Sequence, residues 1–230
     1  MIVGSGLIAK AFAPFAPALE RASIYAAGVS NSSCRDEAEF ERDRLRLEDS
    51  IAGMRADMLL VYFSTCSVLD PSSQENSYTA HKLRLEHVAL RRPRSVVVRL
   101  PQVAGNTPNP HTLLNYLYNR IVRSERFDLW RHATRNIIDV ADVASIVADM
   151  LANESLEAGA IVNVANPRNS TMLEIVAAME SVTKRRAIYH SIDKGGDYAI
   201  DVAQLRNSLN RRGMVFDDAY LVRTIGKYYE

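Results

Sequence analysis

Cysteine is scarce in this sequence: Cys34 and Cys66 are the only two, and they form no C-x-x-C pair. We therefore expect no disulfide framework and a reducing, cytoplasmic compartment. The five histidines show neither H-x-x-H nor H-E-x-x-H spacing, and no cysteine stands close to them in sequence. The composition thus predicts no metal site.

Long apolar runs and an excess of one charge are also missing. The apolar run Met58–Phe63 is far too short to cross a bilayer, and the N-terminus lacks the basic residues of a signal peptide. A formal net charge of +1 gives no electrostatic reason to bind nucleic acid or an anionic membrane surface. At 230 residues, the chain is long enough for one nucleotide-binding domain with a small appended lobe.

Short apolar segments alternate with amphipathic ones along the chain. Strands are predicted at 1–3, 23–27, 58–64, 95–100 and 160–164, and helices at about 7–21, 36–53, 77–90, 112–123, 142–153 and 171–183. Pro14 and Pro17 indicate that the first helix is short or broken. The alternation is typical of βαβ units, so we expect an α/β fold with a doubly wound parallel sheet.

The first predicted strand leads into a glycine turn, Gly4-Ser5-Gly6-Leu7-Ile8-Ala9, and then into a helix. Glycine lets the backbone approach a pyrophosphate, and a helix N-terminus offers free N–H groups with a partial positive charge. The pattern favours a phosphate-binding turn, although a G-x-G-x-x-A segment also occurs as a plain tight connection between strand and helix.

Tyr78 and Lys82 are four residues apart in a predicted helix, so both project from one face. A nearby ammonium lowers the pKa of a tyrosine from its usual value of about 10. The tyrosine can then exchange a proton with a substrate oxygen while hydride moves to or from nicotinamide. Thr65, at the carboxyl end of a predicted strand, can reach the same oxygen; alternatively, Ser64 and Thr65 are local hydrogen-bonding residues.

These segments resemble the extended short-chain dehydrogenase/reductase family of nucleotide-sugar epimerases, dehydratases and reductases, over almost the full length of the chain. Ile2–Ala9 is similar to the family's first strand and glycine turn. Phe63–Val68 is similar to the strand that carries the catalytic serine or threonine, and Tyr78-Thr79-Ala80-His81-Lys82 matches Y-x-x-x-K. Thr134–Ala144 resembles the R-D-x-I-H-V-x-D-V-A segment, whose arginine is Arg135 here.

The resemblance implies a complete set of site residues. The catalytic residues it implies are Thr65, Tyr78 and Lys82. The residues implied to contact NAD or NADP are Gly4, Gly6, Leu7, Ile8, Ala27, Gly28, Tyr78, Lys82, Pro101 and Val103. The residues implied to contact a nucleotide-sugar substrate are Ser64, Thr65, Gln102, His111, Thr112 and Arg135, the last through a phosphate. Asp142 is expected to be the N-cap of the helix that follows it.

The sequence departs from the family pattern between Arg21 and Ser23, where about two βα units are missing, because Tyr25–Gly28 is similar to the family's fourth strand. Those units hold the adenosine half of NAD(P), so the residue that distinguishes NAD from NADP cannot be assigned. We therefore expect a shortened Rossmann-like domain at 1–105. An interleaved substrate-binding lobe with returning sheet elements is expected at 106–230.

Hydride transfer at a sugar carbon is the predicted reaction, by an epimerase or a 4-keto-sugar reductase. Cys66 and Ser67 stand where 4,6-dehydratases of the family carry Asp and Glu, which argues against a dehydratase. The alternatives are a non-catalytic nucleotide-sugar binder and a sensor that binds NAD(P)H without turnover. The resemblance also implies a homodimer through the helices at 36–53 and 77–90, with a polar contact because the first helix has a narrow apolar seam.

Overall fold

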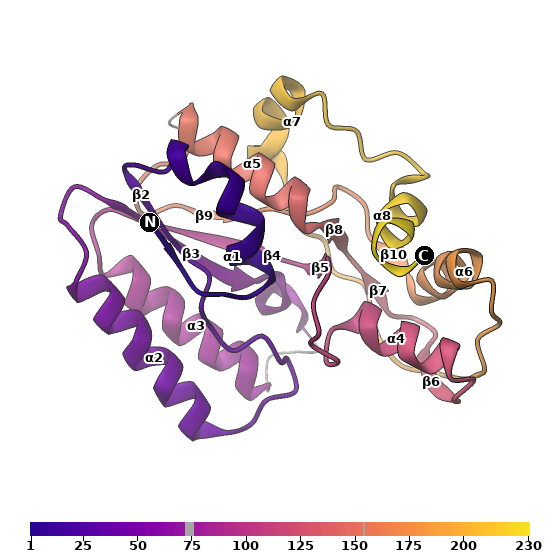
Figure 1. Ribbon diagram of the computed structural model, residues 1–230. Helices are drawn as coiled ribbons and strands as arrows, with labels where there is room; N and C mark the ends of the chain where they lie inside the picture. The colour runs from indigo at the N-terminus through magenta and orange to yellow at the C-terminus, as the bar shows by residue number, and fades with distance from the viewer. Residues whose placement is uncertain (72–75, 154) are drawn as a thin grey trace.

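A five-stranded parallel sheet lies at the centre of the computed structural model, which describes residues 1–71, 76–153 and 155–230 (Figure 1). The strands follow one another across the sheet in the order β1 (Ile2–Val3), β2 (Ala22–Tyr25), β3 (Leu59–Thr65), β4 (Ser95–Leu100) and β9 (Ile161–Asn163). Each neighbouring pair is parallel, which confirms the α/β fold predicted from the alternating segments.

The two faces of the sheet are covered by different helices, and the pleat of β3 separates their cores. Val61 and Phe63 belong to one core, whereas Leu60 and Tyr62 belong to the other. The first core is covered by α1 (Leu7–Phe12), the 3₁₀ helix Ala13–Ala18 and α5 (Val140–Ala152), and the second by α2 (Glu37–Ala52) and α3 (Ser77–Leu90).

The first helix is broken, as its prolines predicted. α1 ends at Phe12, and Pro14 and Pro17 lie in the 3₁₀ helix that continues from it. The buried Leu19 then turns the chain directly into β2. Because nothing intervenes between this turn and β2, β1 pairs with β2 alone and lies at the edge of the described sheet.

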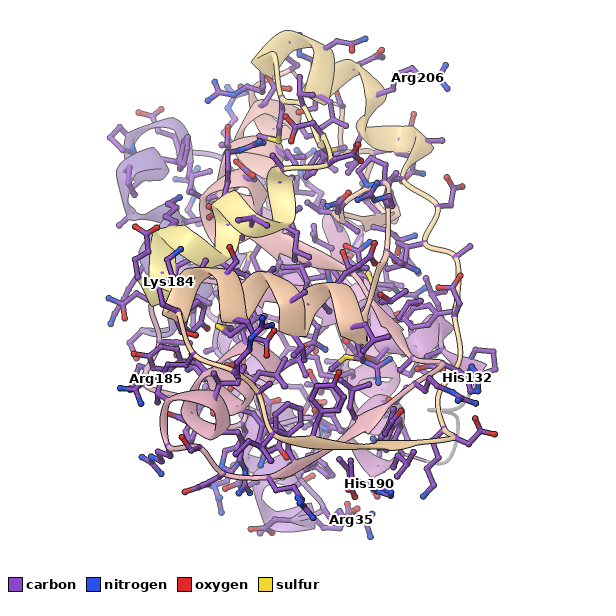
Figure 2. All side chains as sticks on the ribbon, turned by 90° about the vertical axis from the view of Figure 1, so that its right-hand side faces the viewer. Arg35, His132, Lys184, Arg185, His190 and Arg206 are labelled. Carbon is purple, nitrogen blue, oxygen red and sulfur yellow. The ribbon has the colours of Figure 1, made fainter. Side chains whose placement is uncertain are left out.

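Many of the residues after β4 build a third core beside the sheet. Three short strand pairs lie in this part of the chain: β5 (Gln102–Ala104) with β8 (Ile137–Asp139), β6 (Phe127–Trp130) with β11 (Tyr189–Ile192), and β7 (Thr134–Arg135) with β10 (Ser170–Thr171). The helices around them are α4 (Leu113–Val122), α6 (Met172–Thr183) and α8 (Tyr220–Tyr229). Figure 2 shows α6 crossing this face beside α8, with Lys184 at its end.

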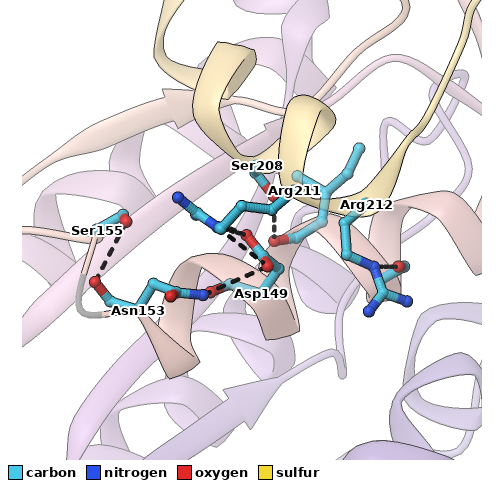
Figure 3. A network of polar contacts seen from close by, with 8 residues as sticks. Asp149, Asn153, Ser155, Ser208, Arg211 and Arg212 are labelled. Carbon is cyan, nitrogen blue, oxygen red and sulfur yellow. Dashed lines mark hydrogen bonds and ion pairs between the residues drawn. The ribbon is translucent and has the colours of Figure 1, made fainter.

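The C-terminal segment returns to the main sheet through α7 (Arg206–Arg212). Arg211 donates to both carboxylate oxygens of Asp149 on α5, at 2.7 to 3.3 Å, and Arg212 Nε donates to Ser145 Oγ at 2.8 Å (Figure 3). Leu205, just before α7, is buried in the same core as α5. The C-terminal segment therefore packs against α5, one of the helices that cover the main sheet.

One detail of α5 differs from the sequence prediction. The N-cap is Asp139, whose side chain accepts from the N–H of Ala141 at 2.8 Å, and not Asp142. Asp142 lies in the first turn and accepts instead from the hydroxyl of Tyr220 on α8, at 2.7 Å. In the chain described by the structure, no helix is long and apolar enough to span a membrane.

Candidate active site

A cavity of about 980 Å³ lies at the carboxyl ends of β1 to β4, where ligands bind in open parallel sheets. The glycine turn, the end of β2, the end of β3, α3 and the segment after β4 all contribute to its wall. Every predicted cofactor-contacting residue lines this cavity. So does every predicted substrate-contacting residue except Arg135.

The glycine turn fits closely against the end of β2. Gly4 has φ +120°, and a Cβ on it would lie 2.6 Å from the carbonyl oxygen of Ala26, so no other residue fits there without a backbone shift. A Cβ on Gly6 would meet nothing within 4 Å, because that side of the turn faces the cavity. The turn therefore has the shape of a cradle that a phosphate can approach through the backbone.

Thr65 and Tyr78 are brought together at the floor of the cavity. Both residues are buried, both line the cavity, and Thr65 lies close enough to Tyr78 to lower the pKa of its phenol. Thr65 Oγ1 also accepts from the N–H of Ser67 at 3.1 Å, where it caps the 3₁₀ helix Cys66–Leu69. Thr65 therefore both caps this 3₁₀ helix and lies beside Tyr78 at the cavity wall. Ser64 lines the cavity as well, but its hydroxyl donates to Glu86 Oε1 at 2.5 Å.

The electrostatics of Tyr78 differ from the sequence prediction. Burial raises the pKa of Tyr78 to about 12, the Asp43 carboxylate adds to this rise, and the hydrogen bond from Thr65 opposes it. Lys82 was expected to lower the pKa, but its Nζ donates to the carbonyl oxygen of Phe63 at 3.1 Å and lies 4.9 Å from the centre of the Tyr62 ring. Burial and the Asp43 carboxylate therefore keep the phenol protonated at neutral pH.

Lys82 is itself strongly affected by its surroundings. Burial lowers the pKa of Lys82 to about 8, against the opposing charges of Asp43 and Glu86. Glu86 is held by Arg99, which donates to its two carboxylate oxygens at 2.9 and 2.6 Å. With this pKa, Lys82 is mostly charged at pH 7, and it loses its charge as the pH rises through about 8.

Behind the lysine lies a buried pair that the sequence prediction missed. Asp43 of α2 accepts from His81 Nε2 at 3.0 Å and from the N–H of Val29 at 3.1 Å. A Cβ on Gly28 would lie 3.4 Å from both Asp43 oxygens and 3.7 Å from Lys82 Nζ, so the carboxylate and the ammonium flank this glycine. The helical spacing in the sequence could have indicated this pair. Phe40, Asp43 and Leu47 share the narrow buried face of α2, so a charged residue occupies a core position.

The substrate side of the cavity is formed by the chain after β4. Thr112 is the N-cap of α4, where its hydroxyl accepts from the N–H of Asn115 at 3.4 Å. His111 and Gln102 line the same cavity as Thr112. Arg135 lies outside the wall, and its charge opposes the rise that burial causes in the pKa of Tyr198. In the part of the chain that the structure describes, no group of three His, Cys, Asp or Glu side chains could hold a metal ion.

Comparison with protein families gives one match. The model of the NAD-dependent epimerase/dehydratase family matches residues 27–165, which is more than half of the chain. The match begins at the end of β2 and includes the Thr65, Tyr78 and Lys82 positions, whereas β1 and the glycine turn precede it. No curated protein matches the chain in a sequence search.

Three solved structures show the same fold. RMD from Pseudomonas aeruginosa, complexed with NADPH, has a TM-score of 0.71 at 19% identity, covering 92% of this chain and 82% of its own. UDP-glucuronic acid 4-epimerase from Bacillus cereus, with NAD, has a TM-score of 0.73 at 15% identity, covering 91% and 73%. dTDP-glucose 4,6-dehydratase from Bacillus anthracis, with NAD, has a TM-score of 0.68 at 15% identity, covering 91% and 71%.

Proposed function

Because the chain belongs to the NAD-dependent epimerase/dehydratase family, we propose that it uses NAD or NADP to exchange hydride at a carbon of a nucleotide-linked sugar. The observation that carries this proposal is the convergence of Thr65, Tyr78 and Lys82 with the glycine turn in one cavity. These residues come from separate elements. A protein that only binds nucleotide sugars has no chemical need for a buried Tyr–Thr–Lys set beside a phosphate-binding turn.

Reduction of a keto sugar is the direction that the protonation states support best. The cavity residues beside the glycine turn would hold NAD(P)H, which would supply the hydride in this chemistry. Tyr78, protonated at neutral pH because burial raises its pKa to about 12, gives its proton to the carbonyl oxygen as that oxygen becomes an alkoxide. The Thr65 hydroxyl donates a hydrogen bond to the same oxygen. The Lys82 ammonium then balances the charge left on the Tyr78 phenolate.

Within the family, we propose that the enzyme is a 4-keto-sugar reductase or an epimerase, and not a 4,6-dehydratase. Water elimination needs a carboxyl acid and base beside the reacting carbons, and the two positions after Thr65 hold Cys66 and Ser67. Cys66 is buried outside the cavity wall, and burial raises its pKa to about 12. Neither side chain can replace the carboxyl pair at neutral pH.

We propose that the nucleotide part of the substrate extends from the cavity toward Arg135. Gln102, His111 and Thr112 line the side of the cavity that this nucleotide would follow. The guanidinium of Arg135 acts on the pKa of Tyr198, which Ser67 of the wall also affects. A planar guanidinium beyond the wall suits a phosphate that projects out of the site.

A titration with reduced cofactors tests the proposal first. Purified protein is mixed with NADH or NADPH, and nicotinamide fluorescence is followed. We expect at least one of them to bind. Absence of binding by both at millimolar concentration, in protein whose absorbance spectrum shows no retained nicotinamide, would contradict the proposed function.

Substitution of Tyr78 separates an enzyme from a binder or sensor. With a panel of UDP- and dTDP-linked 4-keto sugars, we expect Tyr78→Phe to lower the reduction rate by about 10²- to 10⁴-fold, because the proton donor is lost. NADH affinity should stay unchanged. Tyr116→Phe, on α4 and outside the cavity wall, is the matched control with full rate. A wild-type protein that binds cofactor and reduces no member of the panel would favour the sensor.

We also propose a homodimer through the exposed sides of α2 and α3. On α2, Arg44 pairs with Glu41 at 2.6 Å and with Glu48 at 2.5 Å, and Arg91 at the end of α3 reaches Glu48 at 3.5 Å. Among these charges lies the exposed Leu45. The face is thus mainly polar, as the narrow apolar seam of α2 predicted.

A further inference from the structure

We infer that the cavity is a mononucleotide site, which holds the nicotinamide mononucleotide half of the cofactor and leaves the adenosine half without a binding surface. This rests on the proposed function, because it concerns the cofactor of the same site. A doubly wound dinucleotide-binding sheet has two halves, each of which binds one mononucleotide, with the first strand between them. The ligand of this cavity therefore depends on how many halves the sheet contains.

Only one of those halves is present in the described chain. The sheet runs in one direction from β1 through β2, β3, β4 and β9, so β1 is an edge strand. The point at which strand order reverses, where a dinucleotide crosses from one half to the other, does not exist in this sheet. The half that remains carries the glycine turn, Thr65, Tyr78 and Lys82.

The short connection from α1 to β2 is a packed part of the fold. Phe12 and Leu19 are buried in the core with Ile24 of β2. The N–H of Ala22 donates to the carbonyl of Leu19 at 3.1 Å, and the carbonyl of Ala22 accepts from the amino group of Met1 at 2.8 Å. The short connection between α1 and β2 is therefore held by buried side chains and by backbone hydrogen bonds.

Two cations at the cavity wall fit the terminal phosphate of a mononucleotide. Lys10 follows the glycine turn, and Arg46 lies on α2; both are exposed and line the cavity. Neither has an ion-pair partner among the residues that the structure describes. A terminal phosphate carries about two negative charges at neutral pH, whereas each phosphate in a dinucleotide bridge carries one. Cations without an ion-pair partner among the described residues at the wall of this cavity favour the more highly charged group.

The test compares cofactors that differ only in the adenosine half. The protein is titrated with reduced nicotinamide mononucleotide, NADH and NADPH, each followed by nicotinamide fluorescence. We expect the three dissociation constants to agree within about threefold, a difference of less than 1 kcal/mol. ADP at millimolar concentration should not displace bound NADH.

Two other results would have different meanings, one for the inference alone and one for the proposed function. NADH or NADPH binding more than about 30-fold tighter than the mononucleotide, or about 2 kcal/mol, would overturn the inference and leave the proposed function standing. Binding of none of the three would instead overturn the proposed function, and the inference with it.

Variants at the cavity wall test which phosphate is held. We expect Lys10→Met and Arg46→Met each to weaken binding of both ligands, the mononucleotide by the larger factor, about two- to fivefold for exposed cations. Arg42→Met is the matched control on α2, because Arg42 is exposed, pairs with Glu39 at 3.9 Å and does not line the cavity; it should bind like the wild type. Variants that weaken NADH and leave the mononucleotide unchanged would contradict the inference.

Discussion

Lys82 shows how a single residue takes its properties from three elements at once. Its ammonium lies between the carbonyl of Phe63 on β3, the carboxylate of Asp43 on α2 and that of Glu86 on its own helix. Burial prevails over both carboxylates and lowers its pKa to about 8. The unfolded chain therefore holds more protons than the folded one between about pH 8 and about pH 10.4, and rising pH favours folding in that window.

The lowered pKa of Lys82 can be measured directly. The chain has five lysines, so ¹³C-labelled lysine gives a spectrum of five side-chain signals. We expect one signal to titrate near pH 8 in the cofactor-free protein, and this signal to be missing from the Lys82→Met variant. A spectrum in which no lysine titrates near pH 8, or in which that signal survives in the variant, would contradict the burial argument.

At the scale of elements, Asp43 connects α2, α3 and the loop after β2. Burial alone would raise the pKa of Asp43, but the hydrogen bonds from His81 and Val29 and the Lys82 ammonium outweigh it and hold the pKa below its ordinary value. The stabilisation from this lowered pKa is complete above the pKa of the unfolded carboxyl, about 4, and is lost as the pH falls through the lower folded value.

Asp43→Asn tests this connection between the helices. We expect the variant to lose about 1–3 kcal/mol of unfolding free energy at pH 7, because the charged acceptor of two buried donors is removed. The difference from the wild type should shrink as the pH falls below about 4. Urea unfolding at several pH values measures both. Asp49→Asn, exposed on the same helix, is the control, and an equal loss in the two variants would refute a special role for Asp43.

At the scale of the whole molecule, the proposed homodimer is open to a direct test. We expect light scattering to give twice the mass of the chain at low salt. The dimer should weaken as salt rises, because the screening length falls from about 10 Å at 0.1 M to about 3 Å at 1 M. Leu45→Glu on α2 should shift the mass to that of a monomer. Leu173→Glu, an equally exposed leucine on α6, should not; a monomeric wild type would refute the dimer.

Local patterns in the sequence predicted the main helices and strands and most of the residues that line the cavity. The predicted helix at 77–90 has the same bounds in the structure, and the strand predicted at 58–64 lies at Leu59–Thr65. Hydrophobic periodicity acts over neighbouring residues, so a single sequence contains it. The Y-x-x-x-K spacing and the glycine turn likewise predicted residues that line one cavity. The division of the chain at residue 105 stays a prediction.

The sequence by itself therefore determined the α/β fold, the family and the residue types at the cavity, because these depend on local patterns and on the chemistry that each side chain can perform. Only the tertiary structure decided the protonation of Tyr78 and Lys82, the burial of Asp43 against His81, and the position of Arg135 outside the cavity wall. These properties depend on desolvation and on charges brought together from distant segments. The spacing of residues along the chain does not record either.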